Sequence, residues 1–405
     1  MQIPEKYLSS VDNVEEETQI LFALSKQKDA DLGMLDSKQE QIALTIGNKP
    51  IKVKQSLQSL HQSRGSTGSV LWKTSVKVVP WLLQQSWFMN SLTPKTSILE
   101  LGSGISGLAG ILLSPFVGNY VASDKQLYLK KIRENLDQNN ASDVEVHELD
   151  WKSTPYPKDW TFDFLDYVLF FDCIYNPHLN AHLVSCLASL AERYPGMQCL
   201  FAQELRDQET LVDFLERVRP YFEVDLIKME EINKTSVASS TNLPPANMSL
   251  FIMKPYNHEE YMLKALNEAK KCEPTDSAFC VGAVIVQNGK IVSTGYSRER
   301  PGNTHAEECA IEKFMLKNPT DSLEGAIMYS TMEPCSKRLS KKVSCTDLIV
   351  KQKFSTVVLG SLEPDIFVKC EGVDLLKKAG IVVIEKLTFQ DDCLREAVRG
   401  HPPKH

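Results

Sequence analysis

The sequence predicts an α/β fold in two domains, and three observations support this prediction. The chain has 405 residues, more than the roughly 100–200 residues of a usual domain. Apolar strands alternate with amphipathic helices from residue 68 to about residue 220, which is typical of a doubly wound, mostly parallel sheet. A second alternation starts at residue 256, so we expect one domain at 1–255 and a smaller one at 256–405.

The elements of the first domain follow in order after a polar N-terminal extension, residues 1–60. The strand predicted at 165–171 is almost wholly apolar, as expected for a parallel strand that is buried on both faces. Residues 222–228 and 248–253 form two strands without a helix between them, so we expect them to pair antiparallel and close the sheet. The other predicted strands lie at 39–53 (one or two, with a turn at Gly47-Asn48), 97–101, 119–123, 144–148 and 198–202. The other predicted helices lie at 14–24, 70–83, 126–139, 178–193 and 207–218, and one more helix follows the strand at 97–101 and ends at about residue 113.

The second domain is predicted as a three-layer α/β/α structure. Asn288-Gly289 is a strong signal for a tight turn between two strands. The predicted elements are helices at 258–271 and 305–317, further helices after 330 and after 359, and strands at 281–286, 290–295, 326–330, 356–359 and 380–385.

Charge and cysteine usage exclude several classes of protein. The net charge of −7 lies entirely in residues 1–255, because residues 256–405 hold 21 basic and 21 acidic residues, so neither part is a general nucleic-acid binder. The ten cysteines divide three and seven between these parts, and odd counts without a signal region argue against a disulfide framework. No apolar run reaches about 18 residues, so we expect no membrane span. We expect the cytoplasm as the compartment, with the nucleus as an alternative; the oligomeric state stays open.

A glycine run in the first domain indicates a cofactor site. Gly102, Ser103 and Gly104 follow a strand and open a helix, where backbone N–H groups approach a ligand, and Asp124 ends the next strand. An acidic residue at that position suits ribose hydroxyls. Glu100 before the glycines and the single nucleotide-binding half favour S-adenosylmethionine over a dinucleotide, and a tight turn without a ligand is the alternative.

A metal-type constellation marks the second domain. His305 and Glu307 begin a helix, Cys335 follows a strand, and nine residues separate Cys335 from Cys345. One histidine and two thiolates form a three-ligand zinc site with an open fourth position. Zinc lowers the pKa of its bound water to ~7, and Glu307 would carry a proton from this water to a leaving amine. A purely structural zinc site is the alternative.

Residues 60–255 resemble the seven-strand, S-adenosylmethionine-dependent protein lysine methyltransferases, most closely the fungal ribosomal lysine methyltransferase 5 group. The matching stretches are Arg64–Lys73, Leu99–Gly104, Leu149–Trp151 and Phe171–Tyr175. The resemblance implies a Rossmann-like sheet and a protein substrate, with ribosomal proteins as one candidate. It implies that the cofactor is lined by Trp72, Gly102, Ser103, Gly104, Asp124, Trp151 and Phe171. It places Asp172 and Tyr175 at the channel for the substrate lysine.

Nine residues between Cys335 and Cys345 exceed the two of the Cys-x-x-Cys in cytidine and transfer-RNA adenosine deaminases, and a long insert of this kind resembles the deaminases of riboflavin biosynthesis. Further stretches extend the match over most of residues 256–405, which look like the fungal diaminohydroxyphosphoribosylaminopyrimidine deaminases. The matching stretches are Gly295–Arg298, Gly302–Cys309, Thr331–Cys335, Arg338–Ser340 and Phe367–Gly372. Lys341 departs from the pattern, which has a glycine there. The resemblance implies a cytidine-deaminase-like fold and a phosphorylated pyrimidine substrate. The residues that flank the site and could contact this substrate are Asn303, Arg298, Arg300, Lys337 and Arg338.

Taken together, the motifs and resemblances predict a bifunctional enzyme. One activity is zinc-hydroxide deamination of a diamino-ribosylamino-pyrimidinone 5′-phosphate in riboflavin biosynthesis, and the other is methylation of a protein lysine from S-adenosylmethionine. Two alternatives stay open: a deaminase that acts on a nucleoside or a transfer-RNA base, and an N-terminal domain that only binds and transfers nothing.

Overall fold

The computed structural model divides into two compact units, residues 1–255 and 256–405. The structure describes residues 3–25, 33–36, 38–57, 67–153, 162–230, 247–338, 343–364 and 370–401. The motif residues that lie outside these ranges are 64–66, 339–341 and 367–369, which include Lys341. Within the described ranges, every helix is too short or too polar to cross a bilayer.

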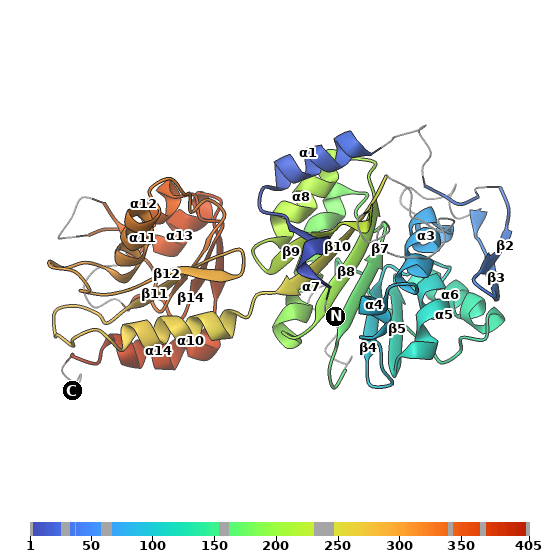
Figure 1. Ribbon diagram of the computed structural model, residues 1–405. Coiled ribbons are helices and arrows are strands. Elements are labelled where there is room, and N and C mark those ends of the chain that lie inside the picture. Colours follow the sequence, from blue (N-terminus) through green and yellow to red (C-terminus); the bar gives the residue numbers. More distant parts are fainter. Residues whose placement is uncertain are drawn as a thin grey trace. The chain divides into compact units, whose positions relative to one another are not determined.

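The first unit is built on one sheet with the strand order β1-β9-β10-β8-β7-β4-β5-β6. The strands from β8 to β6 are parallel, and β10, β9 and β1 continue the sheet antiparallel (Figure 1). This confirms the predicted mostly parallel sheet and its antiparallel strand pair. The strands are β1 (Leu8–Ser10), β4 (Ser97–Leu101), β5 (Asn119–Asp124), β6 (Glu145–Glu148), β7 (Tyr167–Phe171), β8 (Gln198–Glu204), β9 (Phe222–Ile227) and β10 (Met248–Pro255).

Strand β1 makes the sheet eight-stranded, where the sequence predicted seven. Leu8 pairs with Ile227 and Ser10 with Asp225, so β1 and not β9 is the edge of the sheet. Three residues that include two serines have no apolar alternation, and only backbone pairing with β9 defines this strand. The N-terminal extension therefore contributes to the main sheet.

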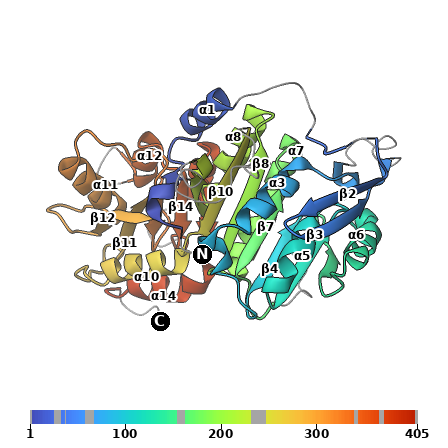
Figure 2. The same cartoon turned by 45° about the vertical axis from the view of Figure 1, so that its right-hand side comes forward.

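Alternate residues of each central strand face opposite helical layers. In β7, Leu169 and Phe171 pack in the cluster that includes α3, α5 and α6, while Val168 and Phe170 pack in the cluster that includes α7 and α8. Figure 2 shows the sheet of this unit with α3, α5 and α6 labelled on one side of it. The helices are α1 (Val14–Leu24), α3 (Lys73–Leu82), α4 (Ser86–Met89), α5 (Leu108–Leu113), α6 (Gln126–Gln138), α7 (Pro177–Arg193) and α8 (Gln208–Val218), with 3-10 turns η1 (Glu5–Tyr7), η2 (Thr67–Ser69) and η3 (Ser114–Phe116).

Two parts of the first unit refine the predicted elements. The residues expected to start a helix at 70 instead follow the 3-10 turn η2, and α3 begins at Lys73. A hairpin of β2 (Gln41–Ile46) and β3 (Lys49–Lys54) packs on α6, where Asn135 and Asn139 accept hydrogen bonds from backbone N–H groups of β3. This hairpin confirms the predicted turn at Gly47-Asn48.

The second unit has a five-stranded sheet in the order β12-β11-β13-β14-β15. Ala283 and Ile285 of β11 face the layer of α11, α12 and α13, whereas Val284 and Val286 face α10 and α14, so the predicted three layers are confirmed. Asn288 and Gly289 have positive φ angles, as the tight turn requires. The sequence did not predict α14. The elements are α10 (His258–Ala269), β11 (Gly282–Gln287), β12 (Lys290–Tyr296), α11 (Ala306–Lys317), β13 (Ile327–Ser330), α12 (Cys345–Lys351), β14 (Thr356–Leu359), α13 (Gly372–Lys378), β15 (Val382–Glu385), η5 (Leu387–Phe389) and α14 (Gln390–Ala397).

Candidate functional site

A cavity of the first unit lies at the carboxyl ends of β4, β5 and β7, which is the usual ligand position in an open α/β sheet. All nine residues that the sequence assigned to the cofactor and to the lysine channel line this cavity. They are Trp72, Gly102, Ser103, Gly104, Asp124, Trp151, Phe171, Asp172 and Tyr175. The fold therefore brings together side chains from positions about 100 residues apart.

The glycine turn is shaped by close contacts. Gly102 and Gly104 have φ angles of 62° and 58°, which favour glycine, and a Cβ atom at Gly102 would lie 2.9 Å from Sγ of Cys173. The backbone N–H of Gly104 donates a 2.8 Å hydrogen bond to Oδ2 of Asp124. Burial raises the pKa of Asp124 to about 6. The carboxyl group is thus held at the cavity wall where the sequence expected it.

Asp172 lines the cavity, and both of its carboxylate oxygens accept hydrogen bonds from protein donors. Arg206 donates to both carboxylate oxygens, one bond measuring 2.8 Å, and Gln203 Nε2 donates a further bond of 2.9 Å. Arg206 also pairs with Glu204 at 2.7 Å and lies 5.2 Å from the centre of the Trp72 ring. Sequence reasoning missed Arg206, although a charged cluster directly after the apolar β8 was a signal for it.

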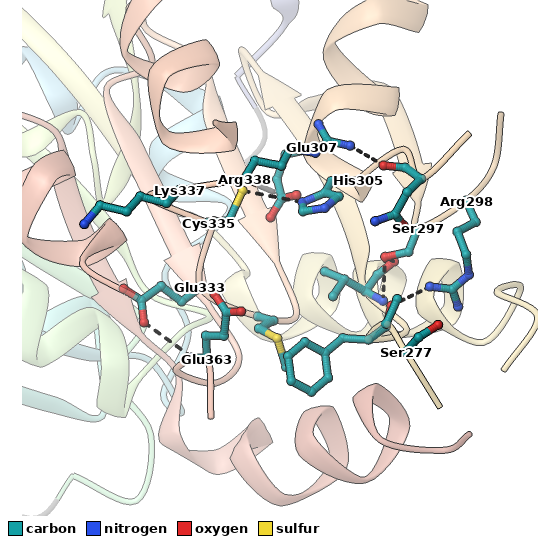
Figure 3. Close-up of a pocket in the computed structure, with 15 residues that line it drawn as sticks. Ser277, Ser297, Arg298, His305, Glu307, Glu333, Cys335, Lys337, Arg338 and Glu363 are labelled. Carbon is teal, nitrogen blue, oxygen red and sulfur yellow. Dashed lines mark hydrogen bonds between the residues drawn. The ribbon is translucent and has the colours of Figure 1, made fainter. Parts of the chain in front are cut away.

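The second unit brings the three predicted metal ligands together. The ligand atoms of His305, Cys335 and Cys345 lie within 4.8 Å of one another. Nδ1 of His305 is 3.5 Å from each sulfur, and Figure 3 shows His305 and Cys335 facing each other beside Glu307. Two sulfurs and one imidazole nitrogen are a donor set that suits Zn²⁺.

The local structure explains why these side chains converge. His305 is the N-cap of α11, Cys345 begins α12, and Cys335 lies in the loop after β13. The backbone N–H of Cys345 donates to Sγ of Cys335 at 3.4 Å. Hydrogen bonding to Cys345 and His305 lowers the pKa of Cys335, which favours the thiolate that binds metal.

Glu307 is buried on the first turn of α11 and lines the same cavity as His305 and Cys335. Burial raises its pKa. Its Oε1 accepts a 2.8 Å hydrogen bond from Ser330, the last residue of β13, which the sequence did not single out. A carboxyl group that is held in place and is easily protonated suits proton transfer.

The structure changes the interpretation of Arg338 and Asn303. Both line the cavity, but Arg338 forms a buried 2.8 Å ion pair with Glu308 and donates to the backbone carbonyl of Asn303. Arg338 therefore joins the loop after Cys335 to the start of α11, and its charge is already compensated.

Two family models match the chain. Residues 255–361 match the cytidine and deoxycytidylate deaminase zinc-binding region, and residues 51–220 match the lysine methyltransferase family. The first match contains His305, Glu307, Cys335 and Cys345. The second spans the cavity of the first unit from β3 to the end of α8.

Curated relatives match the second unit. The riboflavin biosynthesis protein RibD of Aquifex aeolicus is 38% identical over 126 residues, 31% of this chain and 33% of that protein. The diaminohydroxyphosphoribosylamino-pyrimidine deaminase of Buchnera aphidicola subsp. Schizaphis graminum is 37% identical over 124 residues, 30% of this chain and 80% of that protein. The chain belongs to this deaminase family. It covers 26–34% of the length of the first RibD proteins that it matches.

Among solved structures, the chain is similar to the Aspergillus oryzae Rib2 deaminase, as a C-terminal deletion mutant. The identity is 32%, the match covers 36% of this chain and 92% of that chain, and the TM-score is 0.32. The same deaminase in complex with DARIPP matches with the same identity and TM-score.

Proposed function

We propose that the chain is a bifunctional enzyme, with a deaminase in residues 256–405 and a methyltransferase in residues 1–255. The deaminase would act on a diamino-ribosylamino-pyrimidinone 5′-phosphate of riboflavin biosynthesis. Water replaces the exocyclic amino group, a ring carbonyl forms and ammonia leaves. The convergence of His305, Cys335, Cys345 and Glu307 at one cavity is the observation that carries this proposal.

In this proposal His305, Cys335 and Cys345 hold zinc. Zinc, when bound, supplies the Lewis acidity that makes water nucleophilic near neutral pH. Glu307 would take a proton from the attacking water and deliver it to the leaving amine. The hydrogen bond from Ser330 holds Oε1 of Glu307 in place. The membership of the relatives in riboflavin biosynthesis supports the choice of a phosphorylated pyrimidine over other amines.

A direct assay tests the deaminase. Purified, zinc-loaded chain is mixed with the pyrimidine phosphate, with cytidine or with adenosine-containing transfer RNA, and the released ammonia is measured. We expect release from the pyrimidine phosphate alone. Release only from cytidine or the RNA would replace the riboflavin assignment with the nucleoside or transfer-RNA alternative. Complementation of a riboflavin auxotroph with the full chain is the matching test in cells.

The methyltransferase proposal rests on the first unit's cavity. Its glycine turn, Asp124 and the rings of Trp72 and Trp151 form a wall that suits S-adenosylmethionine, and the matching lysine methyltransferase family supports a protein lysine as the acceptor. The acceptor protein would be a partner of the chain, with ribosomal proteins as the first candidates.

Equilibrium dialysis with S-adenosylmethionine tests cofactor binding, and transfer of a labelled methyl group to ribosomal proteins tests catalysis. Absence of binding would leave the first unit as a binding module of another kind. We place the chain in the cytoplasm, and none of its ten cysteines forms a disulfide, which supports a reducing compartment. Microscopy of the tagged chain checks this location.

A further inference from the structure

The deaminase pocket has an apolar wall that the catalytic proposal does not use. Phe279, which lies just before β11, lines the same cavity as His305 and Glu307, together with Val281 and Met332. Phe279 is 9% exposed. Most other lining side chains are polar or charged, so this wall is where a flat, weakly polar ring would be favoured.

A residue from the far end of the chain supports Phe279. The rings of Phe279 and His401 are stacked, with centroids 5.3 Å apart and an angle of 18° between their planes. Nε2 of His401 also lies 3.3 Å from the carbonyl oxygen of Ala278. Two aromatic planes at this distance restrict each other's rotation, so His401 fixes the orientation of the Phe279 ring.

The backbone around Phe279 is tied in the same way. Arg298, which the sequence placed among the residues that could contact the substrate, donates to the carbonyls of Phe279 at 3.0 Å and of Glu273 at 2.7 Å. Figure 3 shows Arg298 and Ser277 at one end of the pocket and Lys337 at the other. This network fixes one side of the segment 272–280.

The C-terminal residues hold the other side of this segment. The N–H of Cys280 donates to the carbonyl of Ala397 at 2.9 Å, and Arg399 donates to the carbonyl of Cys272 at 2.6 Å. A Cβ atom at Gly400 would lie 2.4 Å from the backbone nitrogen of Thr275, so glycine permits this close approach. The end of α14 and residues 398–401 therefore form part of the support for the pocket wall.

We propose that Phe279 is the platform on which the pyrimidine ring of the substrate stacks, and that His401 is the positioning residue that holds this platform. The inference deepens the proposed deaminase function and rests on it. A pyrimidine that presents its exocyclic amine to Glu307 has to lie in this cavity, and aromatic side chains bind bases through their π faces. Phe279 determines specificity by selecting a flat ring, while the metal site supplies the reactivity.

Steady-state kinetics on the full, zinc-loaded chain with the pyrimidine phosphate test the proposal. Phe279→Leu keeps an apolar side chain and removes the flat face, so we expect KM to rise about tenfold while kcat changes less than about twofold. His401→Ala should raise KM about threefold to fivefold, and His401→Phe, which restores a stacking ring, should return KM to the wild-type value. Arg395→Ala, an exposed residue of α14, is the matched control and should leave both constants unchanged.

Zinc content and thermal stability are measured for every variant. KM values of Phe279→Leu and His401→Ala within twofold of wild type would overturn the proposal. A failure of His401→Phe to restore KM, or a parallel loss of kcat, zinc and thermal stability in the variants, would show that Phe279 and His401 only stabilise the packing of the domain. An inactive wild-type chain would instead reject the deaminase function itself, and this inference with it.

Discussion

Both carboxylate oxygens of Asp172 accept hydrogen bonds from one guanidinium group, that of Arg206. The Asp172 side chain is 1% exposed and that of Arg206 is 23% exposed, so the pair lies mostly out of water. Removal of the cation leaves a buried, uncompensated carboxylate. We predict that Arg206→Met lowers the free energy of unfolding by about 3 kcal/mol, measured by urea denaturation.

The matched control for this pair is Arg217→Met on α8. Arg217 pairs with Asp213 one helical turn away, but its side chain is 49% exposed, so we expect a loss below about 0.5 kcal/mol. Equal losses in the two variants would show that the Asp172–Arg206 pair is no more important for stability than a surface pair.

Glu307→Gln should separate metal binding from catalysis. The amide keeps the shape of the side chain and can still contact Ser330, but it cannot carry a proton. We expect the deamination rate to fall by roughly 100-fold to 10,000-fold, while zinc content stays at about one ion per chain. Ammonia release and metal analysis of the same preparation check this. Loss of zinc in the variant would contradict the proton-transfer role.

Cys345→Ser should remove the metal. Cys345 is fully buried and its sulfur lies 3.5 Å from Nδ1 of His305. In the variant, a serine hydroxyl takes the place of this thiolate, which is the form of cysteine that binds zinc. We predict a zinc content far below one ion per chain and no deamination. Cys309→Ser is the control, because Cys309 is also buried on α11 but lies outside the metal cluster of the described residues. Equal zinc loss in both variants would point to general unfolding.

Glu100 should make the stability of the apo chain depend on pH. Burial raises its pKa from 4.5 to about 7, and Tyr120 donates a 2.9 Å hydrogen bond to it. Between these two pH values the folded chain keeps a proton that the unfolded chain releases, so stability falls as pH rises through this window. Glu100→Gln should remove roughly 3 kcal/mol of this fall, measured by urea denaturation at pH 4.5 and 7.

The exposed Glu148→Gln serves as the control for this pH series and should leave the slope unchanged. A Glu100→Gln chain with the same pH slope as wild type would show that Glu100 is ionised in the folded state throughout.

Gly102→Ala and Gly47→Ala compare two glycines with nearly equal positive φ angles, 62° and 59°. Both substitutions add the cost of a left-handed alanine, about 1 kcal/mol. Only the new methyl group at Gly102 meets neighbours, Sγ of Cys173 at 2.9 Å and the Trp151 ring at 3.2 Å, whereas nothing lies within 4 Å at Gly47. We predict that Gly102→Ala weakens binding of S-adenosylmethionine by at least about tenfold, and that Gly47→Ala leaves it within about twofold. Dialysis with the labelled cofactor measures the affinity of both variants. Equal affinities of Gly102→Ala and Gly47→Ala for S-adenosylmethionine would show that the space around Gly102 does not determine cofactor binding.

The elements that carry strong apolar patterns could be predicted from the sequence. Strand β4 at Ser97–Leu101 has the predicted bounds, and helix α8 at Gln208–Val218 lies within one residue of them, because their own residues determine burial and helical periodicity. Strand β1 could not be predicted in this way, since its pairing with β9 is a property of the folded sheet edge. Helix α14 could not be predicted either, because its first residues, Gln390 to Asp392, are polar and its buried residues are only Cys393 and Ala397.

The candidate site shows the same division. His305, Glu307, Cys335 and Cys345 could be named from spacing, because metal chemistry restricts the residue types. The partners of Arg338 and Arg206 could not, because an arginine near a pocket has the same sequence pattern whether it binds a substrate or a carboxylate of its own chain. Their pairing with Glu308 and Asp172 depends on tertiary structure.

The contacts between the two cysteines have a consequence for how this site can diversify. Cys345 donates its N–H to the sulfur of Cys335, and the next residue, Thr346, donates to the carbonyl of Cys335. The two ligands are therefore joined by direct bonds across the start of α12, independently of the chain that connects them. Two residues between the cysteines also tie this interval to the helices of the site: Arg338 pairs with Glu308 of α11, and Ser344 is the N-cap of α12. A change in the interval therefore has to keep these two anchors if the spacing of the ligands is to be kept.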